Sequence, residues 1–189
     1  MDRRDEIYEE ALRLFIENGY DNTPLSHIAR SLNLTKAGLY HYFSSKEELL
    51  FRINTFGVER HFLPVLETAE KIEDPEERIA FFIKNYTVKN LTQSPAIKIA
   101  IHEVQRLKPT YQRKIRKTWR RAFDLIRDAI SELETAGRIK KVNKTFATFA
   151  LLGMCTWTLY WFDYERRESA EELADTYVEI FMRGLLKAR

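Results

Sequence analysis

Apolar side chains recur at intervals of three and four residues along most of this 189-residue chain, and that spacing restricts its fold more than any other feature. Such a period places apolar side chains on one face of an α-helix, whereas a half-buried strand alternates at every second residue. No segment alternates convincingly, and 6 Gly and 5 Pro are too few for a turn-dense β fold. The sequence therefore predicts an all-α protein.

Helix start and stop signals divide the chain into about nine helices. Thr23 and Thr35 are suited to cap the second and third helices, and Ser45 with Glu48 forms a capping box. Asp74 followed by Pro75 is a further start signal. The predicted helices cover residues 5–18, 25–32, 35–42, a long stretch from 45, segments that begin at 74, 94 and 109, and the ranges 145–164 and 169–187.

The formal net charge of +3 comes from one short part of the chain. Residues 106–121, the basic stretch, hold eight basic side chains and no carboxylate, whereas each part of the chain on either side is slightly acidic. The eight are Arg106, Lys108, Arg113, Lys114, Arg116, Lys117, Arg120 and Arg121. Any account of function has to name the anion that this stretch faces.

Residues 25–42 have the pattern of a short helix, a turn and a second short helix. Ile28, Leu32, Leu34 and Leu39 are spaced to pack this pair against the first helix. The outer face of the second short helix carries small or hydrogen-bonding side chains, as entry into the major groove of DNA requires. These residues are Thr35, Lys36, Ala37, Gly38, Tyr40 and His41. The alternative is a helical hairpin whose polar face is only solvated, although residues 22–46 contain no carboxylate.

Three runs in this region resemble the TetR family of transcriptional regulators. They are FIENGYDNTPLSHIA at 15–29, LTKAGLYHYF at 34–43 and SKEELL at 45–50, with Asn33 where the family often has Gly. The resemblance implies an all-α homodimer with a helix-turn-helix DNA-binding domain at 1–46 and an effector-binding and dimerisation domain at 47–189. It places the DNA contacts on Thr23, Ser26, Thr35, Lys36, Ala37, Gly38, Tyr40, His41 and Lys46.

The helix that begins at Pro109 combines an apolar stripe with a row of arginines. Ile115, Trp119, Ala122, Phe123, Ile126, Ile130 and Leu133 form the stripe, which predicts a core face. Arg116, Arg120 and Arg127 lie along one flank, with Arg113 just beyond. Because guanidinium groups suit phosphate or carboxylate, the row favours an amphiphilic ligand with an anionic head and an apolar tail.

Residues 109–133, with 152–158 and Trp161, are also similar to TetR-type repressors of fatty-acid or steroid degradation that respond to acyl-CoA thioesters. The sequence therefore predicts an acyl-CoA or another amphiphilic anion as effector. The expected contacts are Phe62, Phe82, Tyr86, Ile101, Arg113, Arg116, Trp119, Arg120, Phe123 and Trp157. The basic stretch could instead be a solvated face, or could pair with the acidic first helix or with a second subunit.

Residues 145–162 form the longest uncharged run, but it contains four threonines and is the only run of this kind. We therefore expect a helix shared between the core and a subunit interface, not a membrane span. The last helix offers a matching stripe of Leu173, Tyr177, Ile180, Phe181, Gly184 and Leu185. The helices at 145–164 and 169–187 are thus predicted to form a four-helix dimer interface.

Other functional classes find little support in the sequence. His61 and His102 lack ligand spacing for a metal site, and no motif of a hydrolase, NTPase or dinucleotide enzyme is present, so we expect neither catalysis nor a cofactor. The single cysteine, Cys155, is expected to be an inert packing residue. A charged N-terminus without an apolar segment and the lack of paired cysteines favour a cytoplasmic protein. The remaining alternative is an acyl-ligand-binding module without operator binding.

Overall fold

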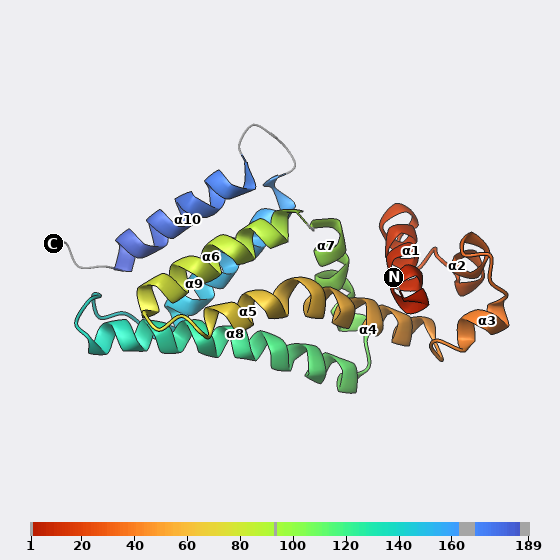
Figure 1. Cartoon of the computed structure of the whole chain (residues 1–189), viewed down its shortest axis with the longest axis horizontal. Helices are drawn as coiled ribbons and strands as arrows, with labels where there is room; N and C mark the ends of the chain where they lie inside the picture. The colour runs from red at the N-terminus through yellow and green to blue at the C-terminus, as the bar shows by residue number, and fades with distance from the viewer. Residues whose placement is uncertain (1, 93, 163–168, 186–189) are drawn as a thin grey trace. The chain divides into compact units, whose positions relative to one another are not determined.

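The structure is a computed structural model that describes residues 2–92, 94–162 and 169–185. Within these ranges the regular elements are all helices (Figure 1). The α-helices are α1 (Arg3–Asn18), α2 (Leu25–Ser31), α3 (Lys36–Tyr40), α4 (Lys46–Gly57), α5 (Leu63–Ala69), α6 (Pro75–Thr92), α7 (Ser94–Glu103), α8 (Pro109–Thr135), α9 (Lys144–Trp157) and α10 (Ala170–Leu185). The prediction of an all-α fold is confirmed.

The predicted helices correspond to these ten, because the long helix predicted from Ser45 contains α4, a π-helical turn at Val58–Phe62 and α5 without a break. The helix predicted for 145–164 is shorter than expected. It ends as α9 at Trp157 and continues as a 3₁₀ turn at Thr158–Tyr160, while residues 163–164 lie outside the described part of the chain. Residues 186–187, predicted to end the last helix, also lie outside it.

Most of the predicted boundaries follow from local chemistry. Gly19 ends α1 with a positive φ of 82°, a conformation that glycine adopts without a steric penalty. Asn33 takes a positive φ of 55° in the turn between α2 and α3. Ser45 accepts a hydrogen bond from the Glu48 N–H at the start of α4, at 3.0 Å. Asp74 caps α6 in the same manner, accepting from two backbone N–H groups.

The chain forms two compact units that interleave in sequence. The first unit comprises residues 1–60 and 95–115, and the second comprises residues 61–94 and 116–189. These units describe packing, whereas the division predicted at residue 46 concerns function and remains a prediction. The packing shows that a segment from the middle of the chain belongs with the N-terminal helices.

The first unit has one hydrophobic core to which distant segments contribute. Phe15, Ile28 and Leu39 bring together α1, α2 and α3, and Leu49 and Leu50 add α4. All five side chains are essentially inaccessible to solvent. Truncating a buried side chain of this size costs about 2–5 kcal/mol, so the position of the two short helices depends on this core.

The second unit packs α6, α8, α9 and α10 around another core. Phe82 and Ile83 of α6 meet Ile126 and Ile130 of α8 in this cluster, together with Leu151 of α9. The buried face of α8 agrees with the predicted stripe at Ala122, Ile126, Ile130 and Leu133. None of the helices in the described ranges has the length and apolar character needed to cross a membrane.

Trp119 was predicted to lie on the core face of α8, but 44% of its surface is exposed, so this part of the prediction is wrong. It lies between Ile115, which packs in the core of the first unit, and Ala122, which packs in the core of the second. A helical period identifies the face of a helix, but it does not show how far along that face other helices extend. Trp157 and Trp161 are exposed as well.

Candidate nucleic-acid interface and ligand region

Helix α3 has only five residues, and its N-terminal cap holds it in shape. The Gly38 N–H donates to the Thr35 hydroxyl oxygen at 2.9 Å, as the predicted cap requires. A Cβ atom at Gly38 would lie 3.2 Å from that oxygen, which is a close approach. Glycine at this position therefore leaves room for the cap and keeps the backbone of α3 open to a partner.

The outer surface of α3 presents the predicted side chains to solvent. Thr35, Lys36, Ala37 and His41 are exposed, and 45% of the Tyr40 surface is accessible. The Lys36 ammonium lies 6.0 Å from the centre of the Tyr40 ring. Ser26 on α2 is exposed too, whereas Gly38 is half-buried. This surface combines a cation, hydroxyl groups, an imidazole and a methyl group, which are the groups that contact phosphates and base edges.

The inner side of the same helix pair fixes its position. Leu39 of α3 and Ile28 of α2 are fully buried, and Ala29 is nearly so. The Leu34 N–H donates to the Ala29 carbonyl oxygen at 2.8 Å across the turn. The two short helices therefore form a helix-turn-helix with a buried apolar side and an exposed polar side.

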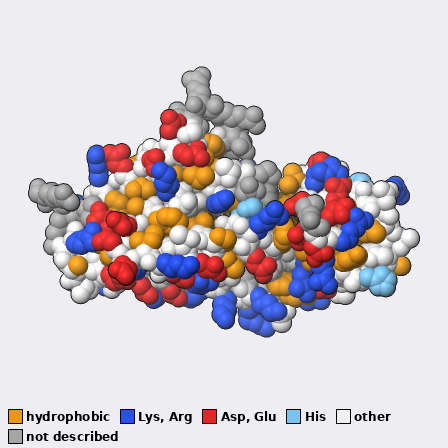
Figure 2. All heavy atoms as spheres, in the orientation of Figure 1, with side chains coloured by type: hydrophobic (Ala, Val, Ile, Leu, Met, Phe, Trp, Pro, Cys, Tyr) orange, Lys and Arg blue, Asp and Glu red, His pale blue; other side chains and the backbone are white. Residues whose placement is uncertain are grey.

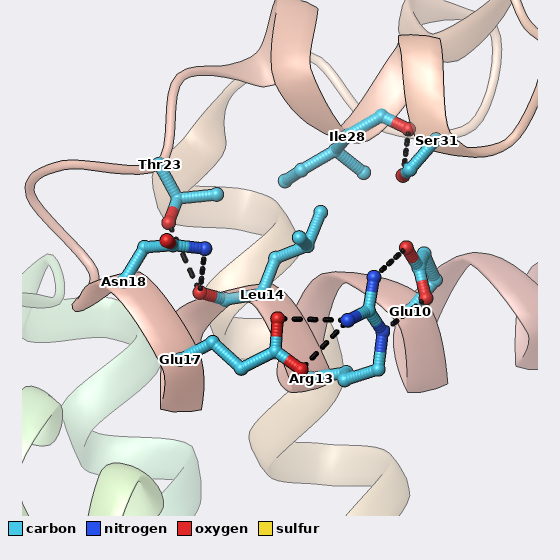
Figure 3. A network of polar contacts seen from close by, with 8 residues as sticks. All are labelled: Glu10, Arg13, Leu14, Glu17, Asn18, Thr23, Ile28 and Ser31. Carbon is cyan, nitrogen blue, oxygen red and sulfur yellow. Dashed lines mark hydrogen bonds and ion pairs between the residues drawn. The ribbon is translucent and has the colours of Figure 1, made fainter.

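Thr23 was predicted to cap α2 and to contact DNA, but its side chain is fully buried. Its hydroxyl lies 2.8 Å from the Gly19 carbonyl oxygen and 3.2 Å from that of Leu14 and donates to them, as Figure 3 shows for Leu14. Helix α2 has no side-chain cap, and Pro24 occupies the N-cap position. Thr23 is thus neither a cap nor an exposed contact, and it anchors the turn between α1 and α2 from inside.

Lys46 is also used within the protein. Its ammonium group donates to the carbonyl oxygens of Tyr20 and Asp21 and lies 4.3 Å from the centre of the Tyr20 ring. Partial burial lowers the pKa of this lysine below its usual value. The Lys46 ammonium group, which was predicted to bind a DNA phosphate, therefore binds backbone oxygens of its own chain.

Three of the five carboxylates of α1 form ion pairs with arginines of the same helix. Figure 3 shows Arg13 between Glu10 and Glu17, with nitrogen–oxygen distances of 2.6 Å and 2.7 Å in the two ion pairs. The hydrogen bond from Arg13 lowers the pKa of Glu10. Among residues 22–46 the ionisable side chains are basic. The acidic balance of the N-terminal residues therefore does not oppose an anionic partner at α3.

Three of the predicted effector contacts come together in the second unit. The ring of Tyr86 lies 5.2 Å from those of Phe62 and Phe82. The Tyr86 hydroxyl is 3.1 Å from that of Thr156 on α9. This cluster is an apolar region with a hydrogen-bonded hydroxyl group at one end.

The arginine row predicted along α8 lies at the surface. Arg116 and Arg120 are exposed, and the guanidinium carbons of Arg120 and Arg127 lie 5.8 Å and 5.9 Å from the centre of the Phe123 ring. Figure 2 shows Lys and Arg side chains gathered over the beginning of α8. Two predicted contacts, Ile101 and Arg113, belong to the first unit, and the other eight belong to the second.

Part of the basic stretch pairs with carboxylates of the protein itself, but the partners described below lie outside the acidic first helix, which the sequence suggested as a partner. Arg106 binds Asp21 through two hydrogen bonds, and Arg121 binds Glu70 through two bonds of 2.6 Å each. The Lys108 ammonium lies 3.5 Å from Glu47. Sequence spacing could not identify these partners, which lie 51 to 85 residues away. Five basic residues are exposed on the part of α8 between these pairs, namely Arg113, Lys114, Arg116, Lys117 and Arg120.

The outer faces of α9 and α10 expose large apolar side chains. Exposed fractions are 69% for Phe146, 60% for Phe149 and 63% for Trp157 on α9, and 59% for Ile180 on α10. The predicted stripe of α10 divides, because Leu185 is buried in the core of its own unit. Large apolar side chains grouped at a surface are typical of a protein interface.

Two family models match the chain. The model described as "Bacterial regulatory proteins, tetR family" matches residues 7–53, and "Tetracyclin repressor-like, C-terminal domain" matches residues 73–185. Together they cover the helix-turn-helix and most of the remaining helices.

Similar proteins span almost the whole chain. One of them is AibR, whose crystal structure is known in complex with isovaleryl coenzyme A and operator DNA. Its sequence is 31% identical, the match covers 95% of this chain and 97% of that chain, and the TM-score is 0.85. The TetR family transcriptional regulator PfmR from Thermus thermophilus is 30% identical over 98% of this chain and 100% of that chain, with a TM-score of 0.86. The HTH-type transcriptional regulator HbdR of Aromatoleum sp. (strain CIB) is 22% identical over 100% of this chain and 82% of that protein.

Proposed function

The chain belongs to the TetR family of DNA-binding transcriptional regulators, and from that premise we propose that it is a homodimeric repressor, released from a pseudo-palindromic operator by an acyl-CoA. The observation that carries the proposal is the exposed polar surface of α3 above a buried apolar side. Members of the family regulate transcription and are not enzymes. We keep the functional division into a DNA-binding domain at 1–46 and an effector-binding and dimerisation domain at 47–189.

In the proposed complex α3 enters the major groove. Lys36 reaches a guanine edge or a phosphate, and the Ala37 methyl group contacts a thymine methyl group. Gly38 allows close approach of the backbone. Hydroxyl groups and the imidazole bind phosphate oxygens and fix the register. The residues with this second role are Ser26, Thr35, Tyr40 and His41.

Dimerisation supplies the second half of the recognition. A pair of such heads about 34–36 Å apart reads two successive turns of the major groove, which doubles the contact area of a single short helix. We assign the dimer interface to the exposed apolar faces of α9 and α10, in a four-helix arrangement with two helices from each subunit. Burial of the exposed aromatic side chains of α9 would contribute to the free energy of association.

The effector proposal combines the arginines of α8 with the aromatic cluster of the second unit. Arg113, Arg116 and Arg120 would bind the phosphates of the CoA group, since guanidinium groups bind phosphate in a bidentate manner. The acyl chain would contact apolar side chains, and the complex of AibR with isovaleryl coenzyme A supports this ligand class. The proposed apolar contacts are Phe62, Phe82, Tyr86, Ile101, Trp119, Phe123 and Trp157. An effector that binds the DNA-incompetent state more tightly lowers operator affinity, and bound operator lowers effector affinity by the same factor.

DNA selection tests the first part of the proposal. Duplexes that bind the full-length protein are selected from a random-sequence library and measured in mobility shifts at several salt concentrations. A palindromic consensus and salt-sensitive binding are expected. The double variant Lys36→Ala/Tyr40→Ala should remove specific binding and leave a folded dimer, while Lys71→Ala, in the second unit, should bind as the wild type does. Unchanged affinity of the double variant would refute the assignment of α3.

Calorimetry tests the effector. The protein is titrated with acyl-CoA thioesters of short, medium and long acyl chains, and the matching free fatty acids serve as ligands without the nucleotide. Arg116→Ala/Arg120→Ala should weaken acyl-CoA binding, whereas Lys140→Ala/Lys141→Ala removes the same charge elsewhere and should not. No binding by the wild type, or equal affinity of both double variants, would exclude this effector site.

A further inference from the structure

The segment between α7 and α8 packs as part of the first unit. It consists of a 3₁₀ turn at Val104–Arg106 followed by Leu107 and Lys108, and it leads into α8 at Pro109. Leu107 is 2% exposed and lies in the core that α1 to α4 form. The first turns of α8 follow, where Tyr111 stacks on Phe51 of α4 with ring centres 4.1 Å apart and planes 7° from parallel. The segment is therefore attached to the N-terminal helices through buried apolar contacts.

Arg106 extends from this segment to the turn that connects α1 and α2. Its guanidinium group donates to both carboxylate oxygens of Asp21, at 2.6 Å and 2.8 Å, and forms an ion pair with Glu103 at 2.8 Å. The hydrogen bond to Asp21 raises the pKa of Arg106, so the guanidinium group keeps its charge at physiological pH. Both hydrogen bonds to Asp21 come from Nη1, whereas Nε faces Glu103. Because two nitrogens of one planar group meet two carboxylates, the orientation of the guanidinium group is fixed as well as its distance from Asp21.

The same turn is held from the other side by Lys46 of α4. Its ammonium group donates to the carbonyl oxygens of Tyr20 and Asp21, the latter at 3.3 Å. The next residue, Glu47, accepts a hydrogen bond from the Lys108 N–H and lies 3.5 Å from the Lys108 ammonium. Two cations therefore hold the turn at Tyr20 and Asp21, and Lys108 ties the start of α4 to the start of α8.

From this arrangement we infer that Arg106 and Lys108 are positioning residues of the DNA-binding surface, although they lie outside the predicted DNA-binding domain. The turn they hold leads within two residues to the buried Thr23 and then to α2 and α3. The inference rests on the proposed DNA binding by α3. It makes operator affinity dependent on the segment that continues, along α8, into the arginines proposed for the effector.

A purely structural surface pair would behave differently. Arg106 and Asp21 are both more than half exposed, and ion pairs at exposed sites usually contribute little to the free energy of unfolding. Loss of the Arg106 charge would also weaken all DNA binding by simple electrostatics. The quantity that separates positioning from charge is therefore the ratio of affinities for the selected operator and for a scrambled duplex.

The test measures that ratio for full-length variants at one salt concentration. We expect Arg106→Ala to lower it about threefold to tenfold, with an unchanged midpoint of thermal unfolding. Arg106→Lys keeps the positive charge but has a single terminal nitrogen in place of the guanidinium group, and it should restore part of the ratio. The matched control is Arg121→Ala, which breaks a bidentate pair with Glu70 in the second unit and removes the same charge.

A mutant cycle with Asp21 completes the test. Asp21→Asn should lower the ratio, and the double variant Asp21→Asn/Arg106→Ala should be no worse than the more affected single variant, because both changes break one contact. The inference is overturned if Arg106→Ala lowers specific and scrambled affinity equally, or if Arg121→Ala has the same effect on the ratio. Failure of the wild type to prefer any selected duplex would instead refute the proposed function.

Discussion

The outer face of α3 and the outer faces of α9 and α10 are both exposed, but they differ in chemistry. On α3 the exposed side chains are short, polar or basic, and only Leu39 of that helix is buried. On α9 and α10 the exposed side chains include Phe146, Trp157 and Ile180, while the opposite sides of these helices pack in the core. The difference is the reason why we propose two partners, a hydrated polyanion for the first face and a second protein surface for the other.

The two faces also differ in how they are held in place. Helix α3 is too short to be stable by itself and depends on the Thr35 cap, the turn at Asn33 and the core below it. Helices α9 and α10 are 14 and 16 residues long and contribute several buried residues each. Disturbing α3 should therefore affect recognition, whereas disturbing α9 and α10 should affect assembly first.

The largest effect is expected from a charge in the apolar face of α10. Ile180→Asp should convert the dimer to a monomer, because a carboxylate in a dry interface is not compensated. Operator affinity should fall by about 1,000-fold or more, since one head alone retains little specificity. Light scattering after size exclusion, together with mobility shifts, measures both quantities. A dimeric Ile180→Asp variant would show that this face serves another purpose, and Lys140→Asp is the control for an added carboxylate.

A smaller effect is expected from a single change on α3. Lys36→Ala should lower operator affinity by about 10-fold to 100-fold without changing the dimer, which corresponds to one base or phosphate contact. The dependence of affinity on salt concentration distinguishes the two cases. If Lys36 binds a phosphate, the slope of log K against log salt falls by about 1 and all sequences are affected alike. If it binds a guanine, one operator position loses its preference.

The cap of α3 should have a measurable but modest effect on stability. Thr35→Ala removes the oxygen that accepts from the Gly38 N–H and should lower the free energy of unfolding by about 1 kcal/mol. Thr35→Ser retains the oxygen and should cost less. Urea unfolding of both variants measures the difference. Equal losses would mean that the methyl group, and not the cap, stabilises this position.

The smallest effect concerns Cys155, which is buried in the core of the second unit. Burial raises the pKa of its thiol to about 11, so the thiolate is scarce at neutral pH and the native protein should react very slowly with a thiol reagent. Unfolding in urea should release one reactive thiol. Because the pKa is raised in the folded state, this contribution to stability is complete below about pH 9, the pKa of an exposed thiol, and is lost as the pH rises through about 11. A Cys155→Ala variant should lose less stability over that interval.

The helical elements and the character of the exposed face of α3 follow from interactions between residues that are close in the chain. Helix caps at Thr35, Ser45 and Asp74, and the positive φ values at Gly19 and Asn33, depend on residues within a few positions of one another. The local sequence carries all the atoms that take part in such interactions. This is why the helix-turn-helix could be predicted with its outward side chains.

The roles of residues whose partners are distant in the chain became clear only from the packing of the helices. Thr23 and Lys46 were predicted as DNA contacts, yet the fold uses one as a buried anchor and the other to hold the preceding turn. Arg106 and Arg121 were assigned to one basic stretch, but each pairs with a carboxylate 51 or more residues away. Periodicity fixes which side of a helix a residue lies on. Which other helix covers that side, and which charge it brings, depends on packing of the whole chain.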